Sequence, residues 1–213
     1  MSGYKGKFIT FEGSEGCGKS TQSRLLLEYF SSRGIPSRLV REPGGVAISE
    51  QIRTILLDKA NTRMNRECET LLYMAARAQM VEEAVLPELR AGTVLVCDRF
   101  LDSTLAYQGY GCGVDPAAIR MMGDFAVRGL VPDLTFLLDL DIEEGLRRRG
   151  GERDRIELRS LEYHNRVRQG YLRIADDNPR RVIVIDARCT VEDIFARICA
   201  RVDLLLEQDR SGS

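Results

Sequence analysis

The residues with the clearest chemistry in this chain form one stretch near the N-terminus, Gly13-Ser14-Glu15-Gly16-Cys17-Gly18-Lys19-Ser20. It fits the pattern G-x-x-x-x-G-K-[ST], whose glycines let consecutive backbone N–H groups turn toward phosphate oxygens. In such a loop the lysine reaches the β- and γ-phosphates, and the hydroxyl that follows it is a ligand for Mg²⁺. The stretch therefore predicts a site for a nucleoside triphosphate, in which Lys19 and Ser20 have these two roles.

A phosphate loop needs a strand before it and a helix after it. Residues 7–11 are short, apolar and rich in strand formers, and residues 20–32 carry apolar side chains at helical spacing. The start of that helix adds the positive end of its dipole to the N–H groups of the loop. The alternative is a glycine-rich turn with a solvated lysine, and both flanks disfavour it.

Length and composition predict a single core and argue against several kinds of site. The chain has 213 residues, 44% of them hydrophobic, and a formal net charge of −1, so no overall field attracts nucleic acid or an anionic membrane. The six cysteines show no metal-ligand spacing and are typical of a reducing compartment, and the lone His164 is expected in helix packing or at the surface. Residues 1–7 lack an apolar signal region, and no apolar run approaches the length of a membrane span. We expect a cytoplasmic protein without nucleic-acid or membrane partners.

Five apolar runs alternate with helical patterns, which predicts an α/β fold with a parallel sheet covered on both faces. The predicted strands are residues 7–11, 37–40, 93–97, 133–140 and 181–185. The longer predicted helices are residues 20–32, 46–57, 66–90 (kinked by Pro87), 156–176 and 191–207. We expect the P-loop NTPase type of fold, with three α/β/α layers around a five-stranded parallel sheet.

Ligands of such sheets bind at the carboxyl ends of the strands, which brings three polar segments to one rim. They are the phosphate loop, Arg41-Glu42-Pro43-Gly44-Gly45, and Asp98-Arg99. The chain lacks the N-K-x-D segment of a guanine-reading switch, and two strand-ending acids, Asp98 and Asp139, fit the weak magnesium pattern of ATPases. Phosphoryl transfer to a small acceptor needs a second anion site, and the arginines near this rim predict one because guanidinium groups bind phosphate bidentately.

A further group of arginines lies between two predicted helices. Residues 147–155 contain five arginines together with Gly150-Gly151. The segment is therefore expected to move as a lid that excludes water and brings arginine to the transferring phosphoryl group. A solvated basic turn is the alternative, and the presence of the phosphate loop favours the lid.

Together these motifs resemble thymidylate kinase. The resemblance rests on the loop at 13–20, on R-E-P-G-G at 41–45 and on D-R-F with S-T-L-A-Y-Q at 98–108, and it spans essentially the whole chain. The last two segments are much more specific than the loop. The resemblance implies one nucleoside-monophosphate-kinase domain over residues 1–213, with a lid at about 147–155. It also implies phosphorylation of dTMP to dTDP by ATP and Mg²⁺ in dTTP biosynthesis, by a homodimer.

The resemblance further implies roles for individual residues. The ATP site comprises Gly13, Ser14, Glu15, Gly16, Cys17, Gly18, Lys19, Ser20 and Thr21. The dTMP site comprises Glu15, Arg41, Glu42, Arg53, Tyr73, Arg77, Arg99, Thr104, Tyr107 and Gln108. In this set Arg99 holds the monophosphate and Glu15 lies near the 3′-hydroxyl. Asp98 positions Mg²⁺ or the lysine, so the metal set is Ser20 and Asp98.

The base of dTMP is expected on the long helix at 66–90 and on the segment after Asp98-Arg99. Tyr73 stands where the family usually has phenylalanine and stacks on thymine, and Arg77 donates to thymine O4, which selects a keto pyrimidine over cytosine. Thr104 and Gln108 flank the base edge, and Tyr107 crowds the 2′ position and disfavours ribose.

Gly16 occupies the position where some thymidylate kinases carry an arginine. The chain therefore resembles the members that place the catalytic arginine in the lid. Arg149 and Arg153 are the candidates, and their spacing does not choose between them. The implied catalytic residues are Lys19, Asp98, Arg99, Arg149 and Arg153.

Two rival functions stay open at this point. The chain could phosphorylate another small acceptor, such as a different nucleoside monophosphate or a deoxynucleoside. It could also be a non-catalytic nucleotide switch that docks a partner protein, in which case dTMP would not accelerate ADP formation.

Overall fold

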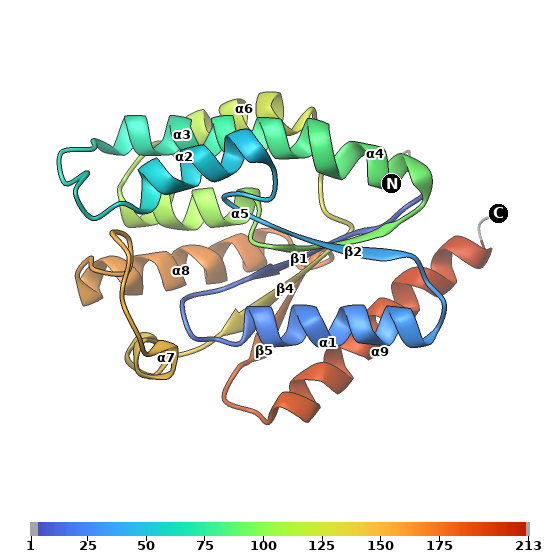
Figure 1. The fold of residues 1–213 in the computed structure, drawn as a ribbon. Helices are drawn as coiled ribbons and strands as arrows, with labels where there is room; N and C mark the ends of the chain where they lie inside the picture. The colour runs from blue at the N-terminus through green and yellow to red at the C-terminus, as the bar shows by residue number, and fades with distance from the viewer. Residues whose placement is uncertain (1–3, 212–213) are drawn as a thin grey trace.

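The computed structural model describes residues 4–211 and arranges them around a five-stranded sheet (Figure 1). The strands are β1 (Phe8–Glu12), β2 (Ser37–Arg41), β3 (Val94–Asp98), β4 (Leu134–Asp139) and β5 (Val182–Asp186). Their order is β2-β3-β1-β4-β5, and every neighbouring pair is parallel. Because β1 is the central strand, the loop that follows it leaves from the middle of the sheet edge.

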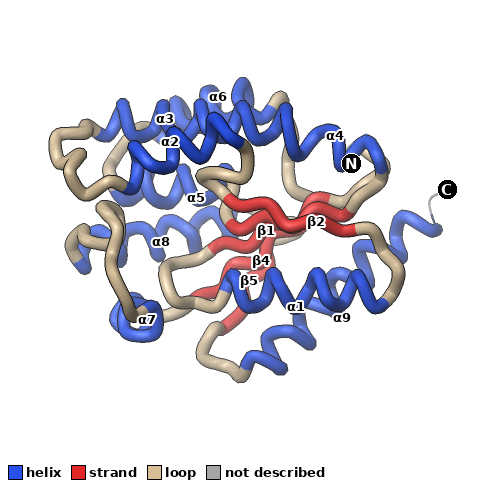
Figure 2. Tube along the Cα trace, viewed as in Figure 1, coloured by secondary structure: helices blue, strands red, loops and turns tan. Residues whose placement is uncertain are grey.

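Helices cover both faces of the sheet, which gives the three expected layers (Figures 1 and 2). On one face lie α1 (Lys19–Ser32) and α9 (Val191–Ser211). On the other lie α2 (Ala47–Leu57), α3 (Arg66–Met80), α4 (Leu86–Ala91), α5 (Leu101–Thr104), α6 (Pro116–Val127) and α8 (Leu161–Asp177). The short α7 (Ile142–Arg149) lies beside the phosphate loop. Within residues 4–211, no helix is both long and apolar enough to cross a membrane.

The side chains of strand β1 pack into hydrophobic clusters on both faces of the sheet. Ile9 and Phe11 belong to the hydrophobic cluster beneath α1 and α9, whereas Phe8 belongs to the cluster beneath α4. Successive side chains of a strand point to opposite faces, so a strand buried on both faces must be apolar throughout. Two polar residues of β1 are exceptions: Glu12 at its end, and Thr10, whose hydroxyl lies 2.7 Å from that of Thr135.

The predicted architecture is confirmed, and two helix boundaries are wrong. The helix expected to start at residue 156 begins at Leu161. The Asp154 carboxylate accepts the N–H groups of Ile156 and Glu157 at 2.8 and 2.9 Å, which forms a turn. Ser160 then caps the helix by accepting from the N–H of Tyr163. The last helix also runs to Ser211 instead of ending at 207.

The helix predicted over residues 66–90 is confirmed and runs from Arg66 to Ala91 with one irregularity. A π-helical turn, Val81–Val85, joins α3 to α4 just before Pro87, with αR backbone at both junctions. Proline has no N–H to donate, and a π-helical turn shifts the hydrogen bonds of a helix at such a point. The predicted kink at Pro87 stays a prediction. A second π-helical segment, Leu105–Gly111, directly continues α5.

Candidate active site

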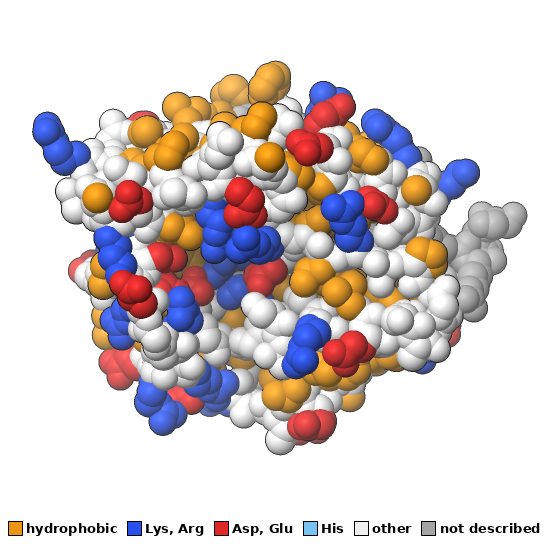
Figure 3. All heavy atoms as spheres, viewed as in Figure 1, with side chains coloured by type: hydrophobic (Ala, Val, Ile, Leu, Met, Phe, Trp, Pro, Cys, Tyr) orange, Lys and Arg blue, Asp and Glu red, His pale blue; other side chains and the backbone are white. Residues whose placement is uncertain are grey.

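A cavity of about 520 Å³ lies at the carboxyl ends of the central strands. Figure 3 shows it as a hollow bordered by Lys and Arg side chains. Its lining includes every residue that the sequence assigned to a nucleotide, a metal or catalysis, apart from Gly13, Ser14, Cys17 and Arg153. It also includes Leu57, Ser103, Asp154, Ile156 and Glu157, which the sequence did not single out.

The phosphate loop is held partly by its own lysine. Lys19 Nζ donates to the carbonyl oxygens of Gly13 at 3.2 Å and of Ser14 at 2.8 Å. Two residues of the loop, Ser14 and Cys17, are buried. Its other members Gly16, Gly18 and Ser20, together with Thr21, line the cavity. The helix α1 begins directly at Lys19, so its N–H groups and dipole face the same space.

Gly16 is where the loop touches α7. Its φ is +69°, and a Cβ built there would overlap the carbonyl oxygen of Gly145 in α7. A Cβ on Gly145 would in turn overlap the carbonyl oxygen of Glu15. Both positions therefore need glycine for the loop and α7 to meet backbone to backbone.

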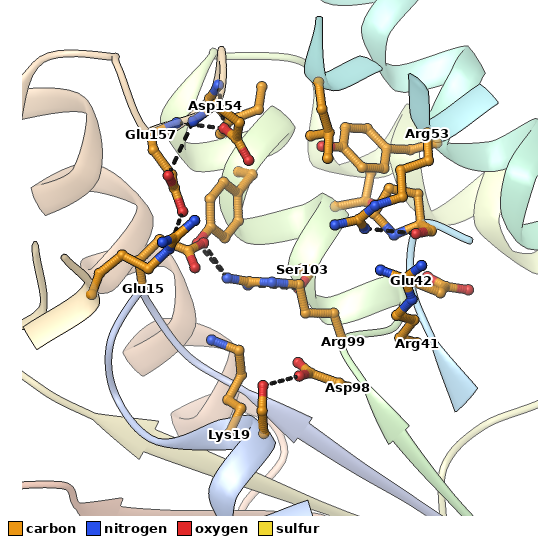
Figure 4. A pocket seen from close by; sticks show the side chains of 18 of the residues that line it. Glu15, Lys19, Arg41, Glu42, Arg53, Asp98, Arg99, Ser103, Asp154 and Glu157 are labelled. Carbon is orange, nitrogen blue, oxygen red and sulfur yellow. Dashed lines mark hydrogen bonds and ion pairs between the residues drawn. The ribbon is translucent and has the colours of Figure 1, made fainter. Parts of the chain in front are cut away.

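The two strand-ending acids have different surroundings. Asp98 accepts the Ser20 hydroxyl at 3.0 Å at the edge of the cavity, where Figure 4 shows it beside Lys19 and Arg99. Asp139 instead accepts two hydrogen bonds from Arg168, at 2.7 and 2.8 Å. Ser20 and Asp98 thus offer hard oxygen ligands of the kind that Mg²⁺ takes together with phosphate oxygens. No group of three or more His, Cys, Asp or Glu side chains that could hold a metal occurs within residues 4–211.

Arg99 lies at the centre of the cavity and is one of two non-glycine residues with positive φ in the described part of the chain. Its guanidinium forms an ion pair with Glu15 and donates to the hydroxyl of Tyr107 at 3.0 Å and to the carbonyl of Gly13 at 3.0 Å. Burial disfavours the charged form of Glu15, but the Arg99 and Lys19 cations outweigh it and hold the pKa of that carboxyl at about 2. Glu15 is therefore an anion at neutral pH.

The opposite end of the cavity contains Arg77, which is 2% exposed. Its Nε donates to Glu42 at 2.7 Å, and its Nη2 donates to the Thr104 hydroxyl at 2.9 Å and to the Phe100 carbonyl at 3.1 Å. Burial raises the pKa of the Glu42 carboxyl against the attraction of Arg77. The second oxygen of Glu42, Oε1, is buried without a partner, and the residue lines the cavity. This carboxylate fixes the direction in which Arg77 can donate.

Gln108 is oriented by an acid that sequence reasoning missed. Its Nε2 donates to Glu69 Oε1 at 2.9 Å, and Glu69 is fully buried. Because an ionised carboxylate only accepts hydrogen bonds, the amide nitrogen must face Glu69. Arg155 and Arg159 bind the same carboxylate at 2.6 Å each. Tyr73, on the same helix as Glu69, lines the cavity.

The five arginines of the predicted lid have separate surroundings. Arg149 lines the cavity and donates to Glu157 at 2.9 Å, whereas Arg153 is exposed and does not line it. Arg155 turns inward, donating to the Leu56 carbonyl at 2.8 Å and binding Glu69. Arg147 and Arg148 pair with Glu144 on the outside of α7. The geometry thus separates the two arginines that spacing could not.

Two arginines predicted for the acceptor side lie at the mouth of the cavity. Arg41 pairs with Glu50 at 2.9 Å, and Arg53 donates to the Pro43 carbonyl at 2.8 Å. His164 is buried, does not line the cavity, and has its pKa lowered by burial. It packs edge-on against Tyr163 in α8.

Three further groups near Arg99 were also missed by sequence reasoning. Glu12, Ser103 and Tyr171 are buried and hydrogen-bonded to one another beside it. Glu12 had a usable signal, because a charged residue ends a mostly apolar strand immediately before the loop. Tyr171 had none, because an aromatic on a helix most often belongs to the core.

Comparisons with known proteins give one consistent result. A family profile described as thymidylate kinase matches residues 11–198. The thymidylate kinase of Geotalea uraniireducens is 49% identical over 205 residues, covering 92% of this chain and 96% of that protein. The thymidylate kinase of Symbiobacterium thermophilum is 46% identical over 207 residues, covering 97% of each. The crystal structure of thymidylate kinase from Ehrlichia chaffeensis matches at a TM-score of 0.75 and 33% identity, covering 92% of this chain and 98% of that one.

Proposed function

This chain belongs to the thymidylate kinase family and phosphorylates dTMP to dTDP with ATP, and from that premise we propose how its own residues bind the two nucleotides and transfer the phosphoryl group. The observation that carries the proposal is the single cavity itself. It joins a phosphate loop at one end to a buried arginine of fixed direction at the other. The phosphate groups of two nucleotides, one bound at each end, can therefore lie close together near Arg99.

ATP is proposed to bind through Gly13 to Thr21, with its β- and γ-phosphates on the loop N–H groups and Lys19. The support is the order of strand, loop and helix, together with the inward lysine. Mg²⁺ is proposed to be held by Ser20 and Asp98, whose side chains lie 3.0 Å apart. When bound, the ion would neutralise charge on the transferring phosphates.

The phosphate of dTMP is proposed to bind Arg99, with Arg41 and Arg53 as further cations at the mouth. The support is the position of Arg99 between the phosphate loop and the rest of the cavity. Glu15 and Tyr107 are bound to Arg99 and therefore lie near the sugar of such a ligand. A tyrosine ring at this point leaves little room for a 2′-hydroxyl.

Thymine is proposed to lie between Tyr73 and the Arg77 end of the cavity. Glu42 and Thr104 hold the Arg77 guanidinium, so a carbonyl oxygen at thymine O4 is a matching acceptor. The amino group at the same position of cytosine is a donor and would face another donor. The amide of Gln108 is held with its nitrogen on Glu69, which leaves its oxygen for a donor on the base.

In the transfer step an oxygen of the dTMP phosphate attacks the γ-phosphorus of ATP. The bond between that phosphorus and the β–γ bridging oxygen breaks, and ADP leaves with the electron pair. The attacking group is already an anion, so the cavity has to align two anions and offset their repulsion more than remove a proton. Lys19, Arg99 and Arg149 are proposed to do this.

The lid arginines supply the decisive test. We expect Arg149→Ala to lower kcat by roughly 10²- to 10³-fold, by analogy with loss of one donor to the transition state. Arg153→Ala, a matched change in the exposed part of the same segment, should stay within about twofold. The measurement is coupled ADP release at saturating dTMP. A full loss in Arg153→Ala with normal turnover in Arg149→Ala would reverse the assignment.

A panel of acceptors addresses the rivals. Turnover of dTMP, dUMP, dCMP, AMP and thymidine with ATP should be fastest with dTMP. Preference for another acceptor would contradict the assignment of the base end. ADP formation that dTMP does not accelerate would favour a nucleotide switch.

A homodimer is proposed on the basis of an apolar patch on α3 and α6. Leu71, Met121 and Phe125 are 56%, 71% and 88% exposed, and the two helices pack side by side. Figure 3 shows hydrophobic side chains gathered over this part of the molecule. Aromatic and methionine side chains are enriched at such interfaces. Phe125→Asp should give monomers in sedimentation equilibrium, whereas Leu204→Asp, an exposed leucine on α9, should not.

The remaining assignments concern the whole chain. Residues 1–213 are proposed to form one nucleoside-monophosphate-kinase domain, with about 147–155 as its lid, because a single sheet carries every element of the cavity. The cytoplasm is proposed as its location, because all six cysteines are free thiols, as a reducing compartment keeps them.

A further inference from the structure

Glu12, the last residue of β1, is a buried carboxylate to which the proposed reaction gives no role. It is 1% exposed and immediately precedes the phosphate loop. Its Oε1 accepts the N–H of Phe100 at 2.7 Å, and its Oε2 accepts the hydroxyls of Ser103 at 2.6 Å and Tyr171 at 2.8 Å. All three donors come from segments distant in sequence.

These three donors surround Arg99. Phe100 follows it in the chain, so its N–H belongs to the peptide group that ends Arg99. The hydroxyls of Ser103 and Tyr171 accept from Arg99 Nη1 at 3.3 and 3.1 Å. Glu12 is therefore linked to the backbone of Arg99 through the N–H of Phe100. It is linked to the guanidinium of Arg99 through the two hydroxyl groups.

The backbone of Arg99 needs such support. Its φ of +71° lies in the left-handed region, which side chains with a Cβ rarely adopt. A residue stays there only when the surrounding structure holds it. On one side the N–H of Arg99 continues the sheet by donating to Phe11 at 2.9 Å, and on the other Glu12 holds the N–H of Phe100.

We propose that Glu12 is a positioning residue, which holds Arg99 in its left-handed conformation and aims its guanidinium at the phosphate of dTMP. This inference rests on the proposed role of Arg99 as the ligand of that phosphate. A carboxylate suits the task because it has acceptors only, so it takes all three donors at once. Both hydroxyls then keep their lone pairs toward Arg99.

Ionisation of Glu12 is part of the arrangement. Burial raises the pKa of this carboxyl to about 7, and the Asp102 charge adds to the effect. The charged and titratable groups that face it are Arg99, Asp102, Tyr171 and, on β3, Cys97, and Asp102 is itself paired with Arg181 at 2.6 Å. Protonation in mild acid would replace one acceptor by a donor and loosen the hold on Arg99.

A double-mutant cycle tests the proposal. Arg99→Ala should raise the KM for dTMP by about 10- to 100-fold, the range for a hydrogen bond to a charged group. Glu12→Gln should raise it by about tenfold with the KM for ATP unchanged, since an amide cannot accept all three donors. In the Arg99→Ala background, Glu12→Gln should add nothing, because its effect acts through Arg99.

Two variants on α8 keep the test decisive if Glu12→Gln does not fold. Tyr171→Phe removes one hydroxyl that joins Glu12 to Arg99 and should raise the KM for dTMP by about threefold or more. Tyr163→Phe is the matched control, since within residues 4–211 its buried hydroxyl forms one hydrogen bond, to the Tyr107 carbonyl at 3.4 Å. Equal effects of the two changes would overturn the proposal.

The pH profile adds a readout that general loss of packing would not change. The ratio of kcat/KM for dTMP between wild type and Glu12→Gln should rise as pH passes upward through 7. Taking the ratio removes the titration of the dTMP phosphate itself, whose pKa lies near 6.

The outcomes separate the two levels of inference. An unchanged KM for dTMP in Arg99→Ala would contradict the proposed role of Arg99. A raised KM in that variant, combined with an additive effect or no effect of Glu12→Gln, would leave the proposed function standing and refute the role of Glu12.

Discussion

The two ends of the cavity use charge in different ways. At the phosphate end, Lys19, Arg99 and Arg149 reach a common space. The two arginines are paired with Glu15 and Glu157, and Lys19 is bound to neutral backbone carbonyls. At the base end, the one buried cation, Arg77, is matched by Glu42 at hydrogen-bond distance. The first arrangement attracts anions from solvent, and the second has little net charge and selects by the direction of its donors.

The difference also predicts at which end the loss of a cation would lower the stability of the protein. Arg77 and Glu42 are both almost fully buried, and each carries the charge that is paired with the other. Lys19 is bound to backbone carbonyls of its own loop, which lose little if its side chain is removed. Removing a cation should therefore affect mainly stability at the base end and mainly turnover at the phosphate end.

The largest expected effect is that of Arg77→Ala. The change leaves the Glu42 carboxylate buried without its partner and should lower the free energy of unfolding by roughly 3–5 kcal/mol. Urea unfolding followed by circular dichroism measures it. Exchanging the pair together, as Arg77→Met with Glu42→Gln, should recover much of the loss. A loss below about 1 kcal/mol in the single variant would remove the contrast between the two ends.

Next is Lys19→Ala, which should lower kcat by roughly 10²- to 10³-fold because the lysine stabilises charge that develops on the phosphates. The unfolding free energy should change by less than about 1 kcal/mol, the size of one ordinary hydrogen bond. Lys59→Ala, which breaks an exposed pair with Glu152, is the control for loss of a lysine. A stability loss as large as that of Arg77→Ala would contradict the distinction.

The smallest expected effect is a pH dependence of the free energy of unfolding, caused by Glu12 at the phosphate end. The pKa of Glu12 is raised in the folded state to about 7, so folding favours its protonated form. That contribution is fully present below the ordinary pKa of a glutamate and is lost as pH rises to 7. Wild type should therefore lose about 1–3 kcal/mol relative to Glu12→Gln between pH 4.5 and 7.5.

Glu15 should titrate with the opposite sign. Its pKa of about 2 means that its contribution is present above pH 4.5 and is lost as pH falls toward 2. Glu15→Gln should accordingly abolish part of the acid destabilisation between those values. Thermal unfolding of the three proteins across pH measures both slopes. Parallel curves for wild type and both variants would show that neither carboxyl is perturbed by folding.

The sequence was most informative where function depends on the local backbone. Glycines at fixed spacing, a strand before them and a helix after them identify the loop, because φ/ψ preferences and hydrophobic period act over a few residues. The R-E-P-G-G and D-R-F segments similarly identified the rim. The sequence predicts helix boundaries less well where side-chain hydrogen bonds set them. The predicted start of α8 is wrong because Asp154 forms a separate turn before the helix, and Ser160 caps the helix that follows.

By itself, then, the sequence determined the sheet, the phosphate loop, the family and most of the residues that line the cavity. The tertiary structure decided how those residues are held. It turned Arg149 toward the cavity and Arg155 toward Glu69, and it enclosed Glu12 beneath Arg99. Glu12 meets Ser103 and Tyr171 across 91 and 159 positions of the chain. No local preference encodes contacts of that range, because they exist only after packing has brought separate elements within hydrogen-bond distance.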